Sequence, residues 1–244
     1  MRSALRHREA AMMGVMKIYQ QLLKQHGPQG WWPVRIADFR LQISDRKREE
    51  YGLTYGVPYA KLESLRTDFR DPYFEIAVGA ILTQNTTWRN VAGSIINLYD
   101  EKALTPERLL KLHPMCLQKI IRPAGYFRQK TKKLRFFAQW LVDKHHGDVA
   151  LLKRYSILDT RNKLLNIWGI GNETADSIML YALNKPIFVV DEYTRRLCRE
   201  HGVERKGYDE YRSHFESQLD ADPELFREYH ALIVAWGKNT ITGH

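Results

Sequence analysis

The sequence predicts an all-α fold made of two helical lobes. Apolar residues recur every three or four positions along nearly the whole chain, which is the period of an amphipathic helix. No stretch combines period-two alternation with hairpin turns, so strands are not expected. Residues that start or stop helices separate the apolar stripes. The stripes fall at residues 12–23, 74–82, 91–98, 127–142 and 223–236.

Local signals set the limits of these helices. Gly27-Pro28 ends the first, because glycine readily leaves the helical conformation and proline cannot continue it. Thr105-Pro106 begins a short helix, with threonine as N-cap and proline in the first turn. Gly147 ends the long helix that begins near residue 127, and Pro223 opens the last one.

The 244 residues suffice for one large or two small domains. We expect one lobe to combine residues 1–33 with 188–244, and the other to span residues 72–187, with two hairpin-linked helices at about 158–184. Residues 34–71 differ from both, holding eight basic residues, seven acidic residues and three tyrosines. We interpret them as an insertion whose role the sequence does not reveal.

Charge and cysteine content narrow the function classes. Lys and Arg outnumber Asp and Glu by 38 to 28, a formal charge of +10 that favours a polyanionic partner such as nucleic acid. The two cysteines, Cys116 and Cys198, have no metal-binding spacing, which favours a reducing, cytoplasmic setting without a metal site. We expect no membrane association, since no apolar run approaches spanning length and the basic N-terminus has no signal-peptide core.

The most informative segment is the tight turn Gly169-Ile170-Gly171, which lies between two helical patterns. Glycines permit a close approach of backbone N–H groups to a phosphate, and the helix that follows from Asn172 points its N-terminus at it. Asp191 follows a fully apolar run, residues 186–190. By itself an aspartate there is an ordinary helix N-cap, a role compatible with a second, chemical one.

This pattern, Leu164-x-x-Ile-Trp-Gly-Ile-Gly-x-x-Thr-Ala175 with an acid at Asp191, resembles the helix-hairpin-helix of the endonuclease III superfamily of DNA glycosylases. The resemblance implies a cleft between the lobes for double-stranded DNA and a flipped base, with Asp191 as the catalytic carboxylate. It also implies DNA contacts by the hairpin residues Gly169, Ile170, Gly171, Asn172 and Thr174.

Two departures from the superfamily pattern bear on the chemistry. Bifunctional relatives attack the sugar with a lysine in the helix after the hairpin, where this chain has Glu173. A carboxylate cannot form a Schiff base, so we expect a monofunctional enzyme that does not nick the strand. The four cysteines of an iron–sulfur cluster are also missing, so no such cofactor is expected. The resemblance leaves room for a monovalent cation at the hairpin backbone.

Further segments are similar to the 3-methyladenine DNA glycosylase III branch: residues 27–33, 79–91 and 121–130. In that branch the matching residues line the base pocket. A methylated purine is cationic, so it stacks well on indoles and leaves the sugar as a neutral base. The insertion at 34–71 departs from the branch and could displace the tryptophan pair. The pocket residues implied are Trp31, Trp32, Pro33, Trp88, Glu173 and Lys238.

The resemblance also places Gln84 where the superfamily inserts a wedge into the gap left by the flipped base, and it implies a DNA contact for the neighbouring Asn85. The alternative for Gln84 is a polar helix end. Basic residues near Gly125, among them Arg128, Lys130 and Lys133, form either a solvated helix face or a phosphate-binding one.

The leading hypothesis is therefore a monomeric base-excision-repair glycosylase that hydrolyses the N-glycosidic bond of alkylated purines. Two alternatives stay open. A uracil or thymine mismatch glycosylase of the same fold would need hydrogen-bonding groups in its pocket. A non-catalytic helix-hairpin-helix module would bind DNA and release no base, whatever residue replaced Asp191.

Overall fold

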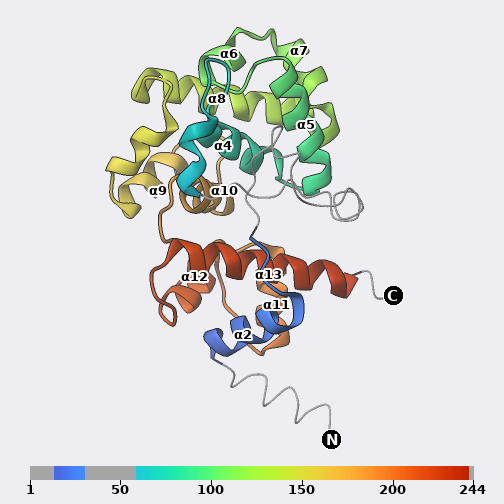
Figure 1. Ribbon diagram of the computed structural model, residues 1–244, viewed down its shortest axis with the longest axis vertical. Helices are drawn as coiled ribbons and strands as arrows, with labels where there is room; N and C mark the ends of the chain where they lie inside the picture. Colours follow the sequence, from blue (N-terminus) through green and yellow to red (C-terminus); the bar gives the residue numbers. More distant parts are fainter. Residues whose placement is uncertain (1–13, 31–58, 242–244) are drawn as a thin grey trace, which may run out of the picture. The chain divides into compact units, whose positions relative to one another are not determined.

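The computed structural model describes residues 14–30 and 59–241, and within them the fold is helical. No strand occurs in these ranges; the only β pairings there are isolated bridges that join Arg70 to Thr67 and Leu104. The predicted all-α class is therefore confirmed. The chain divides into two units, Met1–Gly30 with Pro186–His244, and Trp31–Lys185 (Figure 1). None of the described helices is long and apolar enough to cross a membrane.

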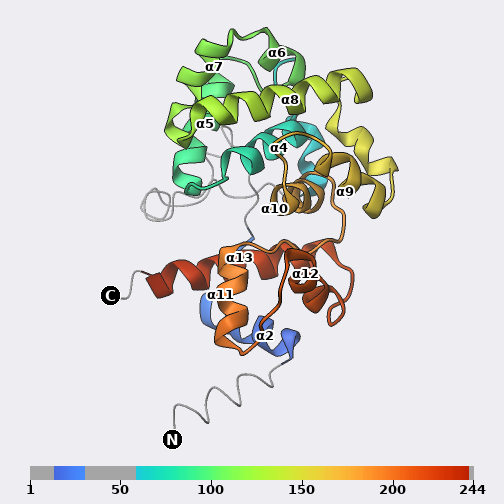
Figure 2. The ribbon, with the colours of Figure 1, turned by 180° about the vertical axis from the view of Figure 1, so that it is seen from behind.

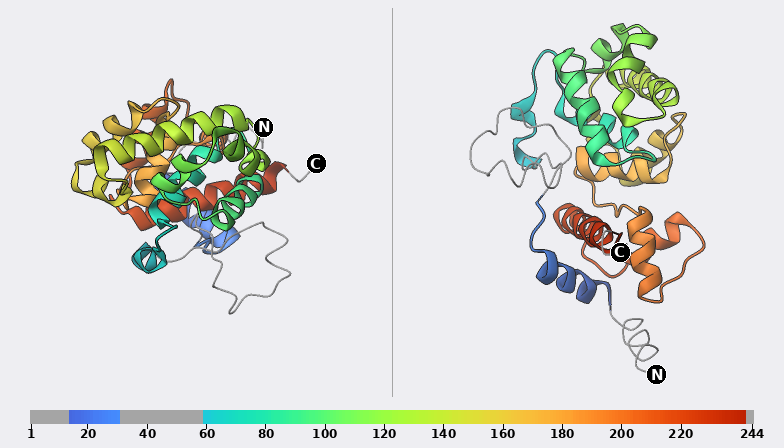
Figure 3. Two further views of the ribbon diagram at one scale, coloured as in Figure 1. Left: turned by 90° about the horizontal axis from the view of Figure 1, so that it is seen from above. Right: turned by 90° about the vertical axis from the view of Figure 1, so that its right-hand side faces the viewer.

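The unit formed by the two chain ends contains four described helices. Phe188 stacks on Phe215, with ring centroids 4.2 Å apart, and meets Tyr229 edge-on at 5.7 Å. The Tyr229 hydroxyl donates to the Val15 carbonyl at 2.8 Å, which fastens the helix at 15–26 to the helix at 223–241. Figure 3 draws both helices. The helices are α2 (Val15–His26), α11 (Glu192–Glu200), α12 (Tyr208–Glu216) and α13 (Pro223–Ile241).

The second unit is built around α4 (Pro72–Leu82), a helix that is buried on nearly every side. A helix that is apolar all round belongs in the interior of a fold. Phe74 of α4 stacks on Phe137 of α8 (Phe127–His145), with ring centroids 6.0 Å apart. Figure 2 shows the ribbons of these two helices. The other described α-helices of this unit are α5 (Trp88–Asp100), α6 (Pro106–Lys111), α7 (Pro114–Ile120), α8 (Phe127–His145), α9 (Ile157–Leu165) and α10 (Asn172–Ser177).

Short helical turns precede α4 or link the helices that follow it. Most are 3₁₀ turns: η1 (Tyr59–Lys61), η2 (Glu63–Leu65), η3 (Arg122–Ala124) and η4 (Val149–Arg154). The remaining turn, η5 (Ile178–Ala182), has π-helical geometry and continues α10 without a break. Its side chains are buried, so the helix after the hairpin is anchored firmly in the core of the unit.

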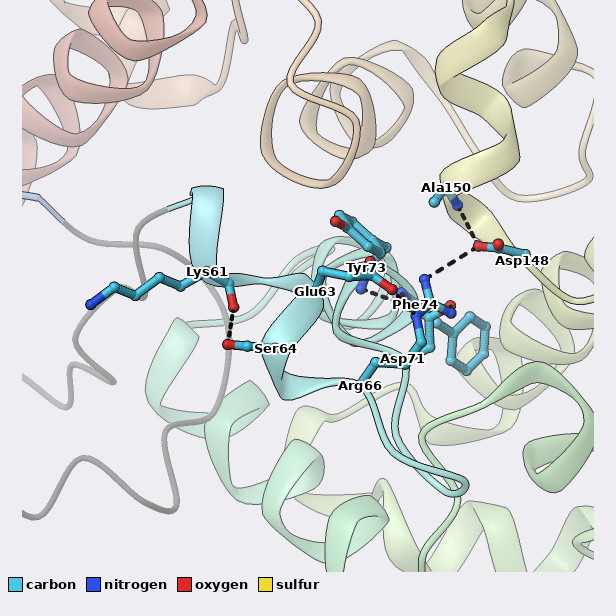
Figure 4. A network of polar contacts seen from close by, with 9 residues as sticks. All are labelled: Lys61, Glu63, Ser64, Arg66, Asp71, Tyr73, Phe74, Asp148 and Ala150. Atoms are coloured by element: carbon cyan, nitrogen blue, oxygen red, sulfur yellow. Dashed lines mark hydrogen bonds and ion pairs between the residues drawn. The ribbon is translucent and has the colours of Figure 1, made fainter.

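The end of the predicted insertion packs against the start of α4. Asp71 is the N-cap of α4 and accepts from the Tyr73 and Phe74 amides at 2.8 and 3.2 Å. Arg66 donates to Asp71 at 3.1 Å and reaches Asp148 at 3.5 Å (Figure 4). Residues 59–71 therefore pack onto the second unit, whereas residues 34–58 lie outside the described part of the chain.

Candidate active site and DNA interface

The hairpin joins α9 to α10 through residues 166–171. Gly169 has φ +87°, a conformation that side chains rarely adopt, and a Cβ there would lie 2.5 Å from Lys133 Cγ. Gly171 differs, because its backbone is extended and a Cβ would meet nothing within 4 Å. The first glycine is therefore required by the fold, whereas the second leaves open space at the N-terminus of α10.

An ion pair holds the two hairpin helices together. Arg161 of α9 donates to the buried Asp176 of α10 at 2.7 Å and to the Asn172 side chain at 3.0 Å. The hairpin amide of Ile170 donates back to the Ile167 carbonyl at 3.1 Å. The first N–H groups of a helix have no partner within the helix, so this turn presents several donors on a rigid frame. Such an arrangement suits a phosphate oxygen.

The turn after α4 is tied to this hairpin. The Gln84 amide nitrogen donates to the Gly169 carbonyl at 3.1 Å and to the Thr174 hydroxyl at 2.9 Å. The Lys133 ammonium donates to the amide oxygen of Gln84. Asn85 follows with φ +54° and is exposed. The predicted DNA-binding residues Gln84, Thr174 and Lys133 thus lie together at one side of the hairpin.

A pocket lies beside this turn, lined by Gln84, Asn85, Tyr126, Gln129, Lys130 and Lys133. The two lysines of this pocket differ in how far their side chains are exposed to solvent. The side chain of Lys130 is only 3% exposed, and its ammonium donates to the carbonyls of Leu82 and Ala124, both at 2.8 Å. Burial, reinforced by the nearby charge of Lys133, lowers the Lys130 pKa to about 8. Lys130 therefore caps the C-terminal end of α4, and its contact with DNA stays a prediction.

Arg128 and Lys133 remain available for phosphate contacts. Arg128 is exposed in the first turn of α8, and Lys133 lies half-buried over Gly169. Removing a phosphate-binding cation weakens DNA binding and reduces its salt dependence. The cluster around the hairpin can therefore support a polyanion on one face of this unit.

Asp191 lies in the other unit, at the N-terminus of α11. One carboxylate oxygen accepts from the Thr194 amide at 2.7 Å and from the Thr194 hydroxyl at 2.9 Å. The second oxygen lies 3.3 Å from His230 Nε2 of α13. Burial tends to raise the Asp191 pKa, but His230 and the Thr194 donors outweigh it and the pKa is lowered. Asp191 is therefore both an N-cap and an ionised carboxylate at neutral pH.

The structure describes three of the remaining predicted pocket residues, Glu173, Trp88 and Lys238. Glu173 is exposed in the first turn of α10, and Trp88 is half-buried at the first position of α5. Lys238 is exposed in the last turns of α13. Trp31, Trp32 and Pro33 lie outside the described residues. Their role in base recognition stays a prediction.

Sequence reasoning missed three residues that organise these sites: Arg161, Thr194 and His230. Thr194 had a usable signal, because a helix N-cap commonly pairs with the residue three positions later. Arg161 and His230 act across 15 and 39 positions of sequence, respectively. No local pattern indicates which arginine or histidine makes such a contact.

Comparison with known proteins now places the chain in a family. Residues 78–220 match the model of the HhH-GPD superfamily base excision DNA repair proteins. This match spans more than half of the chain, so the protein belongs to that superfamily of DNA glycosylases. The helix-hairpin-helix at 157–177 and Asp191 lie inside the matched region.

Relatives and solved structures agree with this placement. The chain is 37% identical over 223 residues to "Putative DNA repair glycosylase MJ1434" of Methanocaldococcus jannaschii, covering 90% of this chain and 85% of that protein. It is 29% identical to endonuclease III of Thermotoga maritima over 132 residues, 54% of this chain and 57% of that one. The fold is similar to H. pylori 3-methyladenine DNA glycosylase bound to 1,N6-ethenoadenine, with TM-score 0.60 and 25% identity over 75% of this chain and 96% of that one.

Proposed function

We propose that this DNA glycosylase hydrolyses the N-glycosidic bond of alkylated purines such as 3-methyladenine and leaves an unnicked abasic site. The observation that carries the proposal is Asp191, an ionised carboxylate with one oxygen bonded to Thr194 and the other 3.3 Å from His230 Nε2. It stands 20 residues after Gly171 of the hairpin.

DNA binding would be shared among the groups around the hairpin. The amides at the start of α10 hold a phosphate oxygen, and Lys133 and Arg128 add charge on the same unit. Gln84 would enter the gap left when the damaged base leaves the stack. Extruding a base costs a few kcal/mol or so, and a damaged base costs least.

The chemical step is the departure of the base from the sugar. The bond between C1′ and the base nitrogen breaks with its electron pair going to the base, so a cationic alkylpurine leaves neutral. The sugar becomes an oxocarbenium-like cation, which the Asp191 carboxylate stabilises electrostatically. Water then adds to C1′ and loses a proton. A leaving group of this kind needs no strong general acid.

The choice of alkylpurines has two supports. The H. pylori enzyme to which the fold is similar is a 3-methyladenine DNA glycosylase, and the chain covers 96% of it. Trp31, Trp32 and Trp88 would supply the indole faces on which a cationic purine stacks, with Pro33, Glu173 and Lys238 bordering the pocket.

The helix after the hairpin supports the proposal of monofunctional action. The described residues of α10 and η5 contain no lysine, and Glu173 stands where bifunctional relatives carry one. The next lysine, Lys185, donates through its ammonium to the carbonyls of Lys153 and Tyr155 at 3.2 and 2.6 Å. No amine in this segment is therefore free to attack C1′.

The hairpin also has the donor set of a monovalent cation site. The carbonyl oxygens of Ile167 and Gly169 each accept one hydrogen bond and keep a second lone pair. A cation held there would add positive charge near the phosphate. No step of the mechanism depends on it.

A substrate panel tests the proposal. Purified protein is incubated with methylated duplex DNA and with duplexes that contain uracil or a thymine mismatch, and released bases are identified by chromatography. We expect release of 3-methyladenine, with strand breaks only after alkali. Release of uracil or thymine alone would replace the substrate assignment, and no release from any duplex would favour a binding module.

A further inference from the structure

The second oxygen of Asp191 has a partner that the N-cap role does not require. A capping aspartate needs one oxygen to accept from the helix, and here that oxygen takes both Thr194 donors, at 2.7 and 2.9 Å. The other oxygen lies 3.3 Å from Nε2 of His230, on α13. The carboxylate therefore has close polar neighbours at both oxygens, from two different helices of one unit.

Both side chains of this pair are largely withdrawn from water, since the Asp191 side chain is 15% exposed and that of His230 is 10% exposed. A carboxylate in such a place needs hydrogen-bond donors to stay ionised. Tyr229, the neighbour of His230, is buried and bonded to Val15, so the α13 backbone at this point is fixed against α2. His230 thus approaches Asp191 from a rigid support.

We propose that His230 is a positioning residue for base release, which orients the Asp191 carboxylate toward the sugar by holding its second oxygen. The proposal rests on the proposed function. Without this donor the carboxylate can turn about its last side-chain bond while one oxygen still caps α11. A carboxylate misplaced by about 1 Å can lose on the order of 100-fold in rate.

The test compares two substitutions of similar volume. His230→Leu keeps the space filled but removes the donor, and His230→Gln places an amide N–H near the Nε2 position. His214→Ala is the control, because His214 lies in the same unit, on α12, and contacts Arg205 and Gln218 and not Asp191. Each variant is assayed for single-turnover release of 3-methyladenine, for duplex affinity and for thermal unfolding.

We expect His230→Leu to slow release by about 10- to 100-fold with duplex affinity unchanged within about twofold. His230→Gln should recover most of the rate, and His214→Ala should match wild type. Combining His230→Leu with Asp191→Asn should be no slower than Asp191→Asn alone, because both changes act through one group.

Three results would overturn the proposal: a wild-type rate in a folded His230→Leu variant, a Gln variant as slow as the Leu variant, or additive losses in the double variant. If His230→Leu does not fold, the folded His230→Gln variant and the double variant of Asp191→Asn with His230→Gln decide. A large loss of rate in His230→Gln, or a double variant slower than Asp191→Asn alone, would then overturn the proposal. A full rate in Asp191→Asn would instead refute the proposed function, so the two failures are distinguishable.

Discussion

The Gln84 amide nitrogen lies 2.9 Å from the Thr174 hydroxyl, so the turn after α4 and the helix after the hairpin are directly bonded. The same amide nitrogen also donates to the Gly169 carbonyl, and its oxygen accepts from Lys133. In the protein without DNA, both polar atoms of the Gln84 side chain are therefore engaged by the hairpin, by α10 or by Lys133. Inserting Gln84 into a duplex would exchange these bonds for contacts with DNA.

Replacing Gln84 with alanine tests this link. We expect Gln84→Ala to weaken binding to a duplex with an abasic site by about tenfold, or about 1.4 kcal/mol, while binding to undamaged duplex changes little. The reason is that only the damaged duplex offers a gap to fill. Fluorescence anisotropy on matched duplexes gives both affinities, and equal losses on the two would contradict a wedge role.

The open space at Gly171 makes it a clean probe of phosphate binding. A Cβ there meets nothing within 4 Å, so Gly171→Ala should cost at most about 1 kcal/mol of stability. In the complex the same methyl group would crowd the phosphate and weaken binding to all duplexes alike, by about tenfold or more. Gly169→Ala is the contrast, because it should destabilise the fold itself. A lesion-specific effect of Gly171→Ala would rule out the phosphate role.

Borohydride trapping tests the absence of a Schiff base. Because α10 carries Glu173 and no lysine, we expect no covalent protein–DNA adduct when base release is carried out with borohydride. A bifunctional endonuclease III assayed in parallel shows that the reagent works. A trapped adduct with the wild-type protein would mean that an amine elsewhere attacks the sugar, and mass spectrometry of the adduct would locate it.

The buried lysine on α8 predicts a pH effect on stability. The Lys130 pKa is about 8 in the folded protein, below its value in an unfolded chain, so the unfolded state binds more protons between these values. The Lys130 contribution to the free energy of unfolding should therefore rise as pH increases from about 8 to 10. Lys130→Met should remove that rise and destabilise the fold by about 1–3 kcal/mol, since two carbonyls lose their donor.

Denaturant unfolding of wild type and Lys130→Met at pH 7, 8, 9 and 10 checks this. Lys132→Met is the control, because Lys132 is exposed on the same helix and should leave both the stability and its pH dependence near wild type. Identical pH profiles for wild type and Lys130→Met would show that the lysine keeps its ordinary pKa.

Much of the fold follows from short-range patterns. The apolar stripes predict α2, α4, α5, α8 and α13, and Thr105 caps α6 as expected, accepting from the Arg108 amide at 3.4 Å. Helices α7 and α12 have only seven and nine residues, too few for a periodic stripe to stand out. Their existence depends on packing within their units.

The candidate site likewise contains residues that local sequence features predict and residues that only contacts between distant parts of the chain explain. Gly169, Gly171 and Asp191 could be found from sequence because a turn and an N-cap are local features. The burial of Lys130 could not, since its carbonyl partner Leu82 is 48 positions away. An amphipathic helix with many lysines gives no indication of which one points inward.

The most direct test of the account is base release by Asp191→Asn. Asparagine caps a helix as well as aspartate does, so α11 should form and the variant should stay folded. We predict that it binds damaged duplex at least as tightly as wild type, because a negative charge has been removed, and that release of 3-methyladenine falls by about 100-fold or more. Release at the wild-type rate by a folded Asp191→Asn protein would contradict the assignment of Asp191 as the catalytic carboxylate.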